Sequence, residues 1–493
     1  MLSDALAAES VRISSCGGAP APKWCQSEDM ADHLTLRFLG GAGTVTGSKF
    51  LLTWRNHRLM VDCGQFQGLK ELRELNWRDF PVDPASIDTI LLTHAHLDHS
   101  GYLPALVRRG FQGRILATKA TIELAEIVLR DAAHLQEQDA ADALRGGYSK
   151  HEKPEPLFDT DDVERTLPLF QEIPIHQVID LGDDLRVKAW RAGHIIGSVC
   201  FRLWVEGQEE EESVIFSGDL GRADHPVLAD REVPDGAANV LIESTYGDRT
   251  HPAEKVSHDI LADAISRTIK RGGNVLIPAF AVDRTEVLLH ALSEMIKAGE
   301  IPEVPIWVNS PMGLRALDVY RDPDNQDEIG PEFKGKPFYD LPTLREARSK
   351  EDSIRLNNPD EPSIIISSSG MATGGRVVHH LQHMLPDPKN SVVFIGYQSP
   401  GTRGRSLVDG AKQLKMYGRY VPVRAEIVQD GSFSGHADVN DLLSWLREIT
   451  PRPQVAYCVH GEPSAAQVMA DRIEAELGIV AVVPKLDEIV RLS

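Results

Sequence analysis

The sequence contains few cysteines and no long apolar run. No two of its 5 cysteines have the C-x-x-C spacing of a thiolate zinc site; they are Cys16, Cys25, Cys63, Cys200 and Cys458. This scatter indicates neither a disulfide framework nor a thiolate metal site. It favours a reducing compartment, so we expect a cytoplasmic protein. No apolar run approaches the roughly 18 residues of a membrane span, so we expect no membrane association.

Basic residues are also scarce relative to acidic ones. The 493 residues include 52 Lys and Arg against 73 Asp and Glu, a formal net charge of −21. This balance argues against a coat of basic surface for nucleic acid. It leaves open a local basic groove, and phosphate binding through metal ions. The length predicts two or three structural units, and 42% hydrophobic residues suffice for large cores.

Residues 1–33 do not have the pattern of a secretory signal. The chain starts without a basic leader or an apolar segment, and a Gly- and Pro-rich stretch follows at 17–22. We therefore expect a flexible N-terminal extension over 1–33. Met30 lies just before the first periodic strand, so the sequence leaves open whether this extension belongs to the native protein.

One hexapeptide concentrates metal-ligand side chains. His94-Ala95-His96-Leu97-Asp98-His99 places three imidazoles and one carboxylate within six positions. The run Thr89–Thr93 before it predicts a short strand, and the residues from Ser100 to Val107 predict a helix. Imidazole and carboxylate on a strand-to-helix turn suit a borderline metal such as zinc. A solvated polar loop is the alternative, and the scarcity of His makes it the weaker one.

Other chemically capable side chains also close short apolar strands. Asp62, His194, Asp219 and Glu243 follow the predicted strands 58–61, 185–190, 213–216 and 238–242. Strand ends along one edge of a sheet bring separate segments into one pocket. Any one of them could be an ordinary loop residue, but the shared placement indicates a common site. Two more histidines, His436 and His460, lie at the edges of short elements near the C-terminus.

The middle of the chain predicts a second, inserted α/β layer. Strands near 275–278, 306–308, 363–366 and 392–395 alternate with helices, which is typical of a parallel sheet. We divide the chain into a first domain at 34–245, the insertion at 246–420 and a return to the first domain at 421–493. Residues 320–360 are expected to be a long irregular segment. Two loops could cradle phosphate, one with Ser369 and Gly370 and one with Arg403 and Arg405, although a solvated turn or a capped helix explains each loop taken alone at least as well.

The order of these motifs resembles one protein family. The hexapeptide has the H-x-H-x-D-H signature of the metallo-β-lactamase superfamily, and the residues around it follow the series of its β-CASP branch. That branch includes short bacterial ribonucleases, RNase J and the nuclease subunit of the cleavage and polyadenylation machinery. The resemblance spans roughly residues 34–470. It implies an αββα sandwich with an inserted β-CASP α/β domain and a zinc-dependent ribonuclease that hydrolyses phosphodiester bonds in RNA processing or decay.

The resemblance also implies a role for each residue. It assigns His94, His96 and His194 to one Zn²⁺, and Asp98, His99 and His460 to a second, with Asp219 bridging the two. Asp62 would orient a ligand or the attacking water, and Glu243 with His436 would place a proton near the leaving oxygen. The resemblance makes Ser369, Gly370, Arg403, Arg405 and Ser434 candidate contacts to the substrate backbone.

Within the branch, His460 favours RNA, because the members that act on DNA typically have an apolar residue there. Three alternatives remain: a DNA nuclease of the same superfamily, a small-molecule metallo-hydrolase and a non-catalytic scaffold. A non-catalytic scaffold would be expected to lack some of the metal-ligand residues of the family, but all of the residues assigned above are present. A single-stranded RNA substrate is expected; homodimerisation, endo- or exonuclease mode and RNA specificity are left open.

Overall fold

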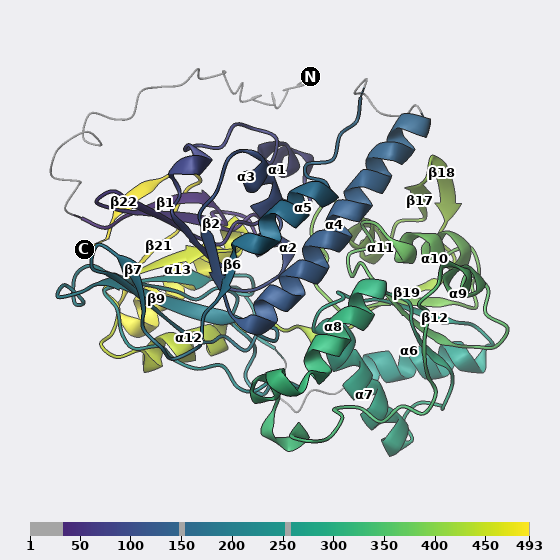
Figure 1. Ribbon diagram of the computed structural model, residues 1–493. Coiled ribbons are helices and arrows are strands. Elements are labelled where there is room, and N and C mark those ends of the chain that lie inside the picture. The colour runs from purple at the N-terminus through teal and green to yellow at the C-terminus, as the bar shows by residue number, and fades with distance from the viewer. Residues whose placement is uncertain (1–32, 147–152, 252–257, 493) are drawn as a thin grey trace, which may run out of the picture.

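The computed structural model describes residues 33–146, 153–251 and 258–492. Two seven-stranded sheets pack face to face (Figure 1). Strand order in the first sheet is β22 (Ile489–Arg491), β1 (Thr35–Gly40), β2 (Lys49–Trp54), β3 (His57–Val61), β4 (Thr89–Leu91), β5 (Arg114–Ala117) and β6 (Phe170–Glu172). The extension predicted for 1–33 lies, apart from His33, outside the described residues.

The second sheet lies beneath the first and carries the C-terminal strands. Its strand order is β21 (Val480–Val482), β20 (Val455–Val459), β11 (Asn239–Glu243), β10 (Ser213–Phe216), β9 (Val199–Val205), β8 (Leu185–Arg191) and β7 (Ile179–Gly182). Alternate side chains of both sheets fill the space between them, including Leu36, Phe38, Phe201 and Phe216. This alternation is what a half-buried strand requires.

Helices cover the outer faces of both sheets. On the first sheet these are α3 (Leu103–Arg108), α4 (Lys119–Gly146) and α5 (Thr160–Thr166); on the second they are α12 (Val439–Glu448) and α13 (Pro463–Leu477). The expected αββα sandwich is thus confirmed. No helix in the three described segments combines the length and apolarity of a membrane span.

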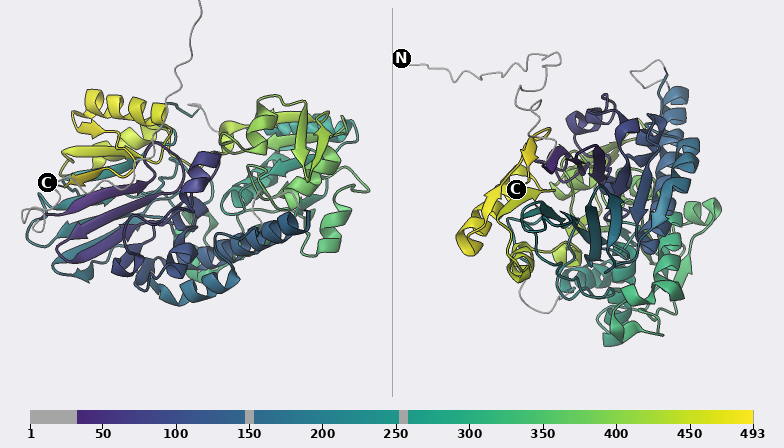
Figure 2. Two further views of the ribbon diagram at one scale, coloured as in Figure 1. Left: turned by 90° about the horizontal axis from the view of Figure 1, so that it is seen from above. Right: turned by 60° about the vertical axis from the view of Figure 1, so that its left-hand side comes forward.

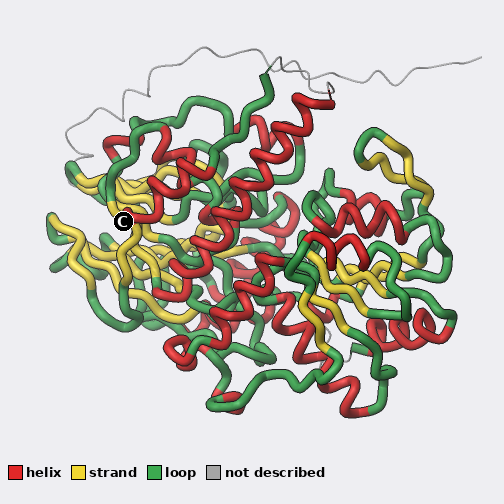
Figure 3. The backbone as a smooth tube through the Cα atoms, turned by 45° about the vertical axis from the view of Figure 1, so that its right-hand side comes forward, coloured by secondary structure: helices red, strands yellow, loops and turns green. Residues whose placement is uncertain are grey.

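The inserted segment forms a second lobe around a parallel six-stranded sheet (Figures 2 and 3). Its order is β14 (Leu344–Glu346), β13 (Ile306–Val308), β15 (Ile364–Ser367), β12 (Val275–Pro278), β16 (Ser391–Phe394) and β19 (Glu426–Gln429). Both faces are covered, as parallel sheets require. One face packs against α6 (Asp259–Lys270), α7 (Arg284–Ala298) and α8 (Pro311–Arg321), and the other against α9 (Lys350–Arg355), α10 (Arg376–Met384) and α11 (Arg403–Val408). A hairpin, β17 (Gln413–Met416) with β18 (Arg419–Pro422), adjoins α11.

Several local predictions were wrong. The strand near 425–428, assigned to the returning first domain, is β19, which pairs with β16 in the sheet of the insertion. The segment 320–360, expected to be irregular, contains β14 and α9. The helix expected from Ser100 to Val107 divides into α2 (Leu97–Ser100) and α3, because Pro104 begins a new first turn.

Candidate active site

The hexapeptide is clamped by backbone contacts from two neighbouring strand ends. The Cys63 N–H donates to the His99 carbonyl at 2.7 Å, and the Ser48 N–H donates to the Asp98 carbonyl at 2.9 Å. The clamp depends on a missing side chain at Gly64, where a Cβ atom would lie 1.6 Å from the Asp98 carbonyl oxygen. These contacts hold the turn between β4 and α2, from which the ligand-type side chains project.

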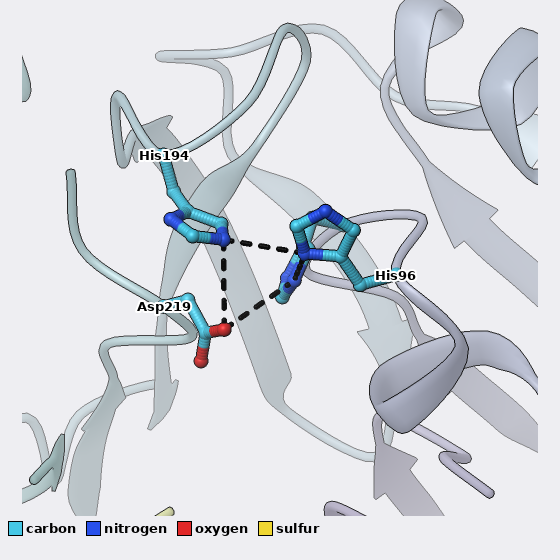
Figure 4. Close-up of side chains that lie close together, drawn as sticks. His96, His194 and Asp219 are labelled. Atoms are coloured by element: carbon cyan, nitrogen blue, oxygen red, sulfur yellow. Dashed lines mark hydrogen bonds and ion pairs between the residues drawn. The ribbon is translucent and has the colours of Figure 1, made fainter. Parts of the chain in front are cut away.

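Four of these side chains converge on one point. The Nδ1 atom of His96 lies 3.1 Å from Nε2 of His94 and 3.2 Å from Nε2 of His194. Oδ2 of Asp219 lies 3.6 and 3.7 Å from the same two Nε2 atoms. Figure 4 shows the His96 and His194 rings and the Asp219 carboxylate pointing toward one another.

A second group shares the carboxylate of Asp219. Its other oxygen, Oδ1, lies 3.2 Å from Nε2 of His99 and 3.7 Å from Nε2 of His460. Nε2 of His460 lies 3.8 Å from Oδ2 of Asp98. One carboxylate therefore presents its two oxygens to two separate sets of three ligand-type side chains.

The spacing and the unpartnered atoms both fit metal ions. Ligands about 2.0–2.1 Å from a tetrahedral zinc lie about 3.3–3.4 Å from one another, which is close to the spacing of both groups. Oδ1 of Asp219 and Nε2 of His99 are buried without a hydrogen-bond partner. Buried polar atoms are normally satisfied, so these two atoms are suited to bind a cation. The two groups could each hold one zinc ion.

Neighbouring polar side chains fix the outer nitrogen of several of these imidazoles. Nδ1 of His99 donates to Oδ2 of Asp62 at 2.7 Å, and Asp62 also accepts from the Thr93 N–H at 2.8 Å. Nδ1 of His460 is hydrogen-bonded to the Ser48 hydroxyl at 2.8 Å. Such contacts leave Nε2 of each ring facing the metal position. Of the two tasks predicted for Asp62, the geometry favours orienting a ligand.

Two of these residues adopt a backbone conformation that side chains disfavour. Asp62 follows β3 with φ 60°, and His460 follows β20 with φ 48°. Positive φ at a residue other than glycine costs roughly 1–3 kcal/mol and clusters at functional sites. The hydrogen bonds of Asp62 to His99 and Thr93, and of His460 to Ser48, hold both residues in place.

Burial and neighbouring charges determine the protonation of the site. Burial lowers the pKa of His94 and of His194, and it lowers the pKa of His96 to about 4. Their imidazoles are therefore neutral and able to donate a lone pair near pH 7. Burial also acts to lower the pKa of His99, but the carboxylates of Asp219 and Asp62 outweigh it and raise that pKa well above its ordinary value.

His436 and Glu243 form a pair beside the shared carboxylate. Nδ1 of His436 lies 3.2 Å from Oε2 of Glu243 and 4.0 Å from Oδ2 of Asp219. The segment around His436 pairs with the one after Asp219, where the Ala437 N–H donates to the Leu220 carbonyl at 2.8 Å. Burial acts to lower the pKa of His436, but Glu243 outweighs it and the pKa is raised. The pair can therefore hold a proton next to the two ligand groups.

A cavity of about 240 Å³ opens over both groups and is walled by both domains. The sandwich contributes Asp98, Asp219 and His460, and the insertion contributes Phe280 and Met312 among others. The cavity therefore lies between the sandwich and the inserted domain.

Only two of the five residues predicted to contact the substrate line this cavity. Ser369 and Ser434 line it, whereas Gly370, Arg403 and Arg405 do not. Gly370 is buried where a Cβ atom would lie 2.9 Å from the Phe280 nitrogen. The loop expected around the two arginines is the helix α11. Arg403 donates to the Thr373 carbonyl at 2.6 Å, and Arg405 is paired with Asp409 at 2.9 Å.

The cavity wall contains one cation that the sequence did not indicate. Arg284, at the start of α7, is buried beside the cavity and is paired with Asp283. Its guanidinium packs against the residue before His436, because a Cβ atom on Gly435 would lie 1.9 Å from Nη2 of Arg284. The sequence signal for it is weak, because Arg284 stands beside Asp283 in a short connection after β12 and has no motif around it.

Three protein-family profiles match consecutive parts of the chain. The metallo-beta-lactamase superfamily profile matches residues 47–279, the Beta-Casp domain profile matches 285–407, and the profile of the Zn-dependent metallo-hydrolase RNA specificity domain matches 420–484. The matches follow the order of the first domain, the insertion and the return.

Two relatives match this chain over most of their own length. Ribonuclease TTHA0252 of Thermus thermophilus is 38% identical over 426 residues, which cover 86% of this chain and 92% of that protein. The RNase J-like protein of Methanocaldococcus jannaschii is 29% identical over 91% of this chain and 97% of its own length. A crystal structure of a protein of unknown function from Enterococcus faecalis covers 93% of this chain and 100% of its own with a TM-score of 0.50. At 14% identity, this last similarity concerns the fold alone.

Proposed function

Because this chain belongs to the β-CASP branch of the metallo-β-lactamase superfamily, we propose that it is a zinc-dependent ribonuclease that hydrolyses RNA phosphodiester bonds at a two-metal site. One observation carries the proposal. Asp219 directs its two oxygens at two separate three-ligand groups, 3.2 Å from His99 on one side and 3.6 Å from His94 on the other. A shared carboxylate of this kind is the arrangement that a two-metal hydrolase needs.

The donor set assigns one ion to each group. His94, His96 and His194 would hold one Zn²⁺, Asp98, His99 and His460 the other, and Asp219 would bind both. When bound, the two ions supply Lewis-acid activation of water and neutralise the charge of the reacting phosphate. Asp62 positions the His99 ring through their 2.7 Å hydrogen bond.

His436 is assigned the proton transfer to the leaving oxygen. Glu243 holds Nδ1 of the ring, so Nε2 is the atom left to donate a proton toward the cavity. Glu243 also accepts the Leu220 N–H at 2.6 Å, which ties the proton donor to the loop that carries Asp219. The proton donor and the metal ligands thus form one connected network.

We assign the binding of the substrate backbone to side chains of the cavity wall. Arg284 is the buried cation there, and Ser369 and Ser434 offer hydroxyl groups. A guanidinium is well matched to phosphate oxygens, so Arg284 replaces Arg403 and Arg405 as the arginine that we place on the substrate. Single-stranded RNA is the form that we expect to enter this walled cavity.

The alternatives fit the site less well. In a small-molecule hydrolase the inserted domain would have no role. In this protein, however, the cavity is lined by Phe280, Met312 and Ser369 of that domain. A non-catalytic scaffold gives no task to a complete ligand set. DNA cleavage is the nearest competing function.

A cytoplasmic location and homodimerisation stay predictions. The three cysteines among the described residues, Cys63, Cys200 and Cys458, are free and buried.

Cleavage assays with labelled RNA and DNA test the proposal. Zinc-loaded wild type should cleave 5′-labelled single-stranded RNA in preference to DNA of the same sequence, and a chelator should stop it. Metal analysis should find two zinc ions per chain. Absence of zinc-dependent RNA cleavage would overturn the proposal, and faster cleavage of DNA would favour the competing nuclease. The product ladder distinguishes exonuclease from endonuclease action.

A further inference from the structure

A short segment of the insertion has the opposite charge balance to the chain. Residues 412–424 contain Lys412, Lys415, Arg419 and Arg424 and no acidic residue, in a protein with a net charge of −21. None of these four cations is within ion-pair distance of an acidic side chain of the described residues. Tyr417 and Tyr420 lie in the same segment.

This segment is the hairpin β17–β18, which projects from the second lobe beside α10 and α11 (Figure 1). All four cations are exposed, and Tyr417 and Tyr420 are 56% and 65% exposed. Tyrosine and arginine are enriched at binding surfaces relative to the rest of a protein surface. We call these six residues the hairpin surface.

The other face of the hairpin is anchored in the domain. Leu414, Met416 and Val421 are buried in the core beneath α10. Tyr417, at the tip, stacks on His379 of α10 with ring centroids 5.0 Å apart and planes 18° apart. The hairpin surface is therefore a preformed feature, and ordering it on binding costs little conformational entropy.

Two side chains face outward together on this surface. Lys415 and Tyr420 are directly opposite in the antiparallel register, with Nζ of Lys415 6.0 Å from the centroid of the tyrosine ring. An aromatic face next to a cation can stack a base and contact its phosphate at the same time. Every base has such a face, so a surface of this kind tolerates any sequence.

The hairpin surface is linked to the cavity through α11. Ser399 lines the cavity just before α11, and the helix packs against β17. Arg403 at the start of α11 binds the carbonyl of Thr373, which also lines the cavity. Arg405 on the same helix is 43% exposed and is paired with Asp409. The helix α11 therefore connects the cavity wall to the hairpin.

We propose that the hairpin surface is a second binding site for single-stranded RNA, which holds the substrate outside the cavity by base stacking on Tyr420 and phosphate contacts to Lys415 on the same face and to the exposed cations Lys412, Arg419 and Arg424 at its edges. The inference rests on the proposed ribonuclease function. Residues 408–419, which include Lys412, Lys415 and Arg419, lie between the matched segments 285–407 and 420–484, whereas Tyr420 and Arg424 lie at the start of the second match. RNA supplies the negative charge that this surface lacks, in keeping with charge complementarity.

Binding measurements test the site independently of turnover. Fluorescence anisotropy of a labelled oligouridylate of about 24 nucleotides is recorded on zinc-loaded protein carrying His436→Ala, so that cleavage does not interfere. Adding Tyr420→Ala should weaken binding about fivefold or more, whereas Tyr420→Phe keeps the ring and should bind like the background. Lys412→Gln with Lys415→Gln should reduce the slope of log Kd against log salt by about 1.4.

A charge-matched control removes two lysines elsewhere on the same lobe. Lys334 and Lys336 are exposed directly after the turn Pro331–Phe333 rather than on the hairpin, and their double change to Gln should leave the affinity and the salt slope unchanged. In otherwise wild-type protein, the hairpin variants should raise KM for the long RNA and leave the cleavage of fragments of about four nucleotides unchanged. The melting temperature of each variant checks that it is folded.

The outcomes separate the two proposals. Hairpin variants that bind and cleave long RNA as the wild type does would overturn this inference and leave the ribonuclease assignment intact; a protein would then be the candidate occupant of the surface. Wild type that binds RNA through the hairpin but cleaves none would overturn the proposed function alone. Equal losses in the hairpin and Lys334/Lys336 variants would show only a loss of total charge, and would also overturn the inference.

Discussion

Asp62 holds His99 by a hydrogen bond of 2.7 Å between Oδ2 and Nδ1, although the two residues are 37 positions apart. Both side chains are buried, and Thr93 donates two further hydrogen bonds to the same carboxylate. The contact presents Nε2 of His99 to Asp219. Asp62 therefore sets the orientation of a proposed metal ligand, although Asp62 itself is not one of the proposed ligands.

Asp62→Asn should lower zinc affinity about 10- to 100-fold, because an amide no longer supports the basicity and orientation of the His99 ring. Competition with a chromogenic chelator measures the affinity. Asp263→Asn, on the exposed face of α6, makes the same chemical change away from the site and should bind zinc like the wild type. Equal zinc affinity in Asp62→Asn and the wild type would contradict the orienting role.

Removal of zinc should destabilise the protein. The ion binds only the folded chain, and at a free concentration 100 times its Kd it adds about 2.7 kcal/mol per site. Thermal unfolding with and without a chelator should show this loss, and it should return when zinc is restored. Asp219→Asn weakens both ligand groups, so its melting temperature should respond less to the chelator. An equal response would show that Asp219 is not shared.

His436→Ala should reduce kcat by about 10²- to 10⁴-fold, the range for loss of a positioned proton donor. Zinc content should not change, because this ring belongs to the pair with Glu243 and not to the two ligand groups assigned above. His134→Ala, exposed on α4, is the control for removal of an imidazole. A variant with the wild-type kcat would remove the proton-donor assignment and leave the metal site untouched.

Glu286→Gln should stabilise the protein more at alkaline than at acidic pH. Burial, and then Asp283, raise the pKa of Glu286 well above its ordinary value, and both its oxygens lack hydrogen-bond partners. The folded chain therefore keeps a proton that the unfolded chain releases above about pH 4.3, so stability falls as pH rises. Glutamine is neutral at every pH and removes this loss.

Melting temperatures of Glu286→Gln and wild type from about pH 5 to about pH 8 measure the effect. The difference between them should grow with pH. Glu294→Gln, exposed on the same helix, should show no such trend. A difference that is constant or shrinks with pH would mean that Glu286 is ionised in the folded protein.

Gly64→Ala should disturb both stability and zinc binding. Its Cβ atom would lie 1.6 Å from the Asp98 carbonyl oxygen, so the hexapeptide must move. Overpacking of this kind costs about 1–3 kcal/mol or more. Gly431→Ala is the control, because no atom lies within 4 Å of its Cβ position. Unfolding by denaturant and metal analysis give the two readouts, and wild-type values in both would contradict the clamp.

Much of the sandwich could be predicted because its signals are local. Alternating apolar residues define strands such as β1 and β8, and each short strand that ends in His or a carboxylate is visible within a few residues. The prediction failed where the deciding contacts were distant. Residues 425–428 form a strand in any interpretation, but only pairing with β16 shows to which sheet β19 belongs.

By itself, the sequence determined the family, the αββα architecture and the chemical types at the strand ends, since spacing and periodicity depend on neighbours along the chain. The tertiary structure alone decided how those side chains are used. It turned the two oxygens of Asp219 toward different histidines, moved Arg403 and Arg405 away from the cavity by folding them into α11, and brought Arg284 there instead. Side-chain direction depends on packing between segments hundreds of residues apart, and no local pattern contains that information.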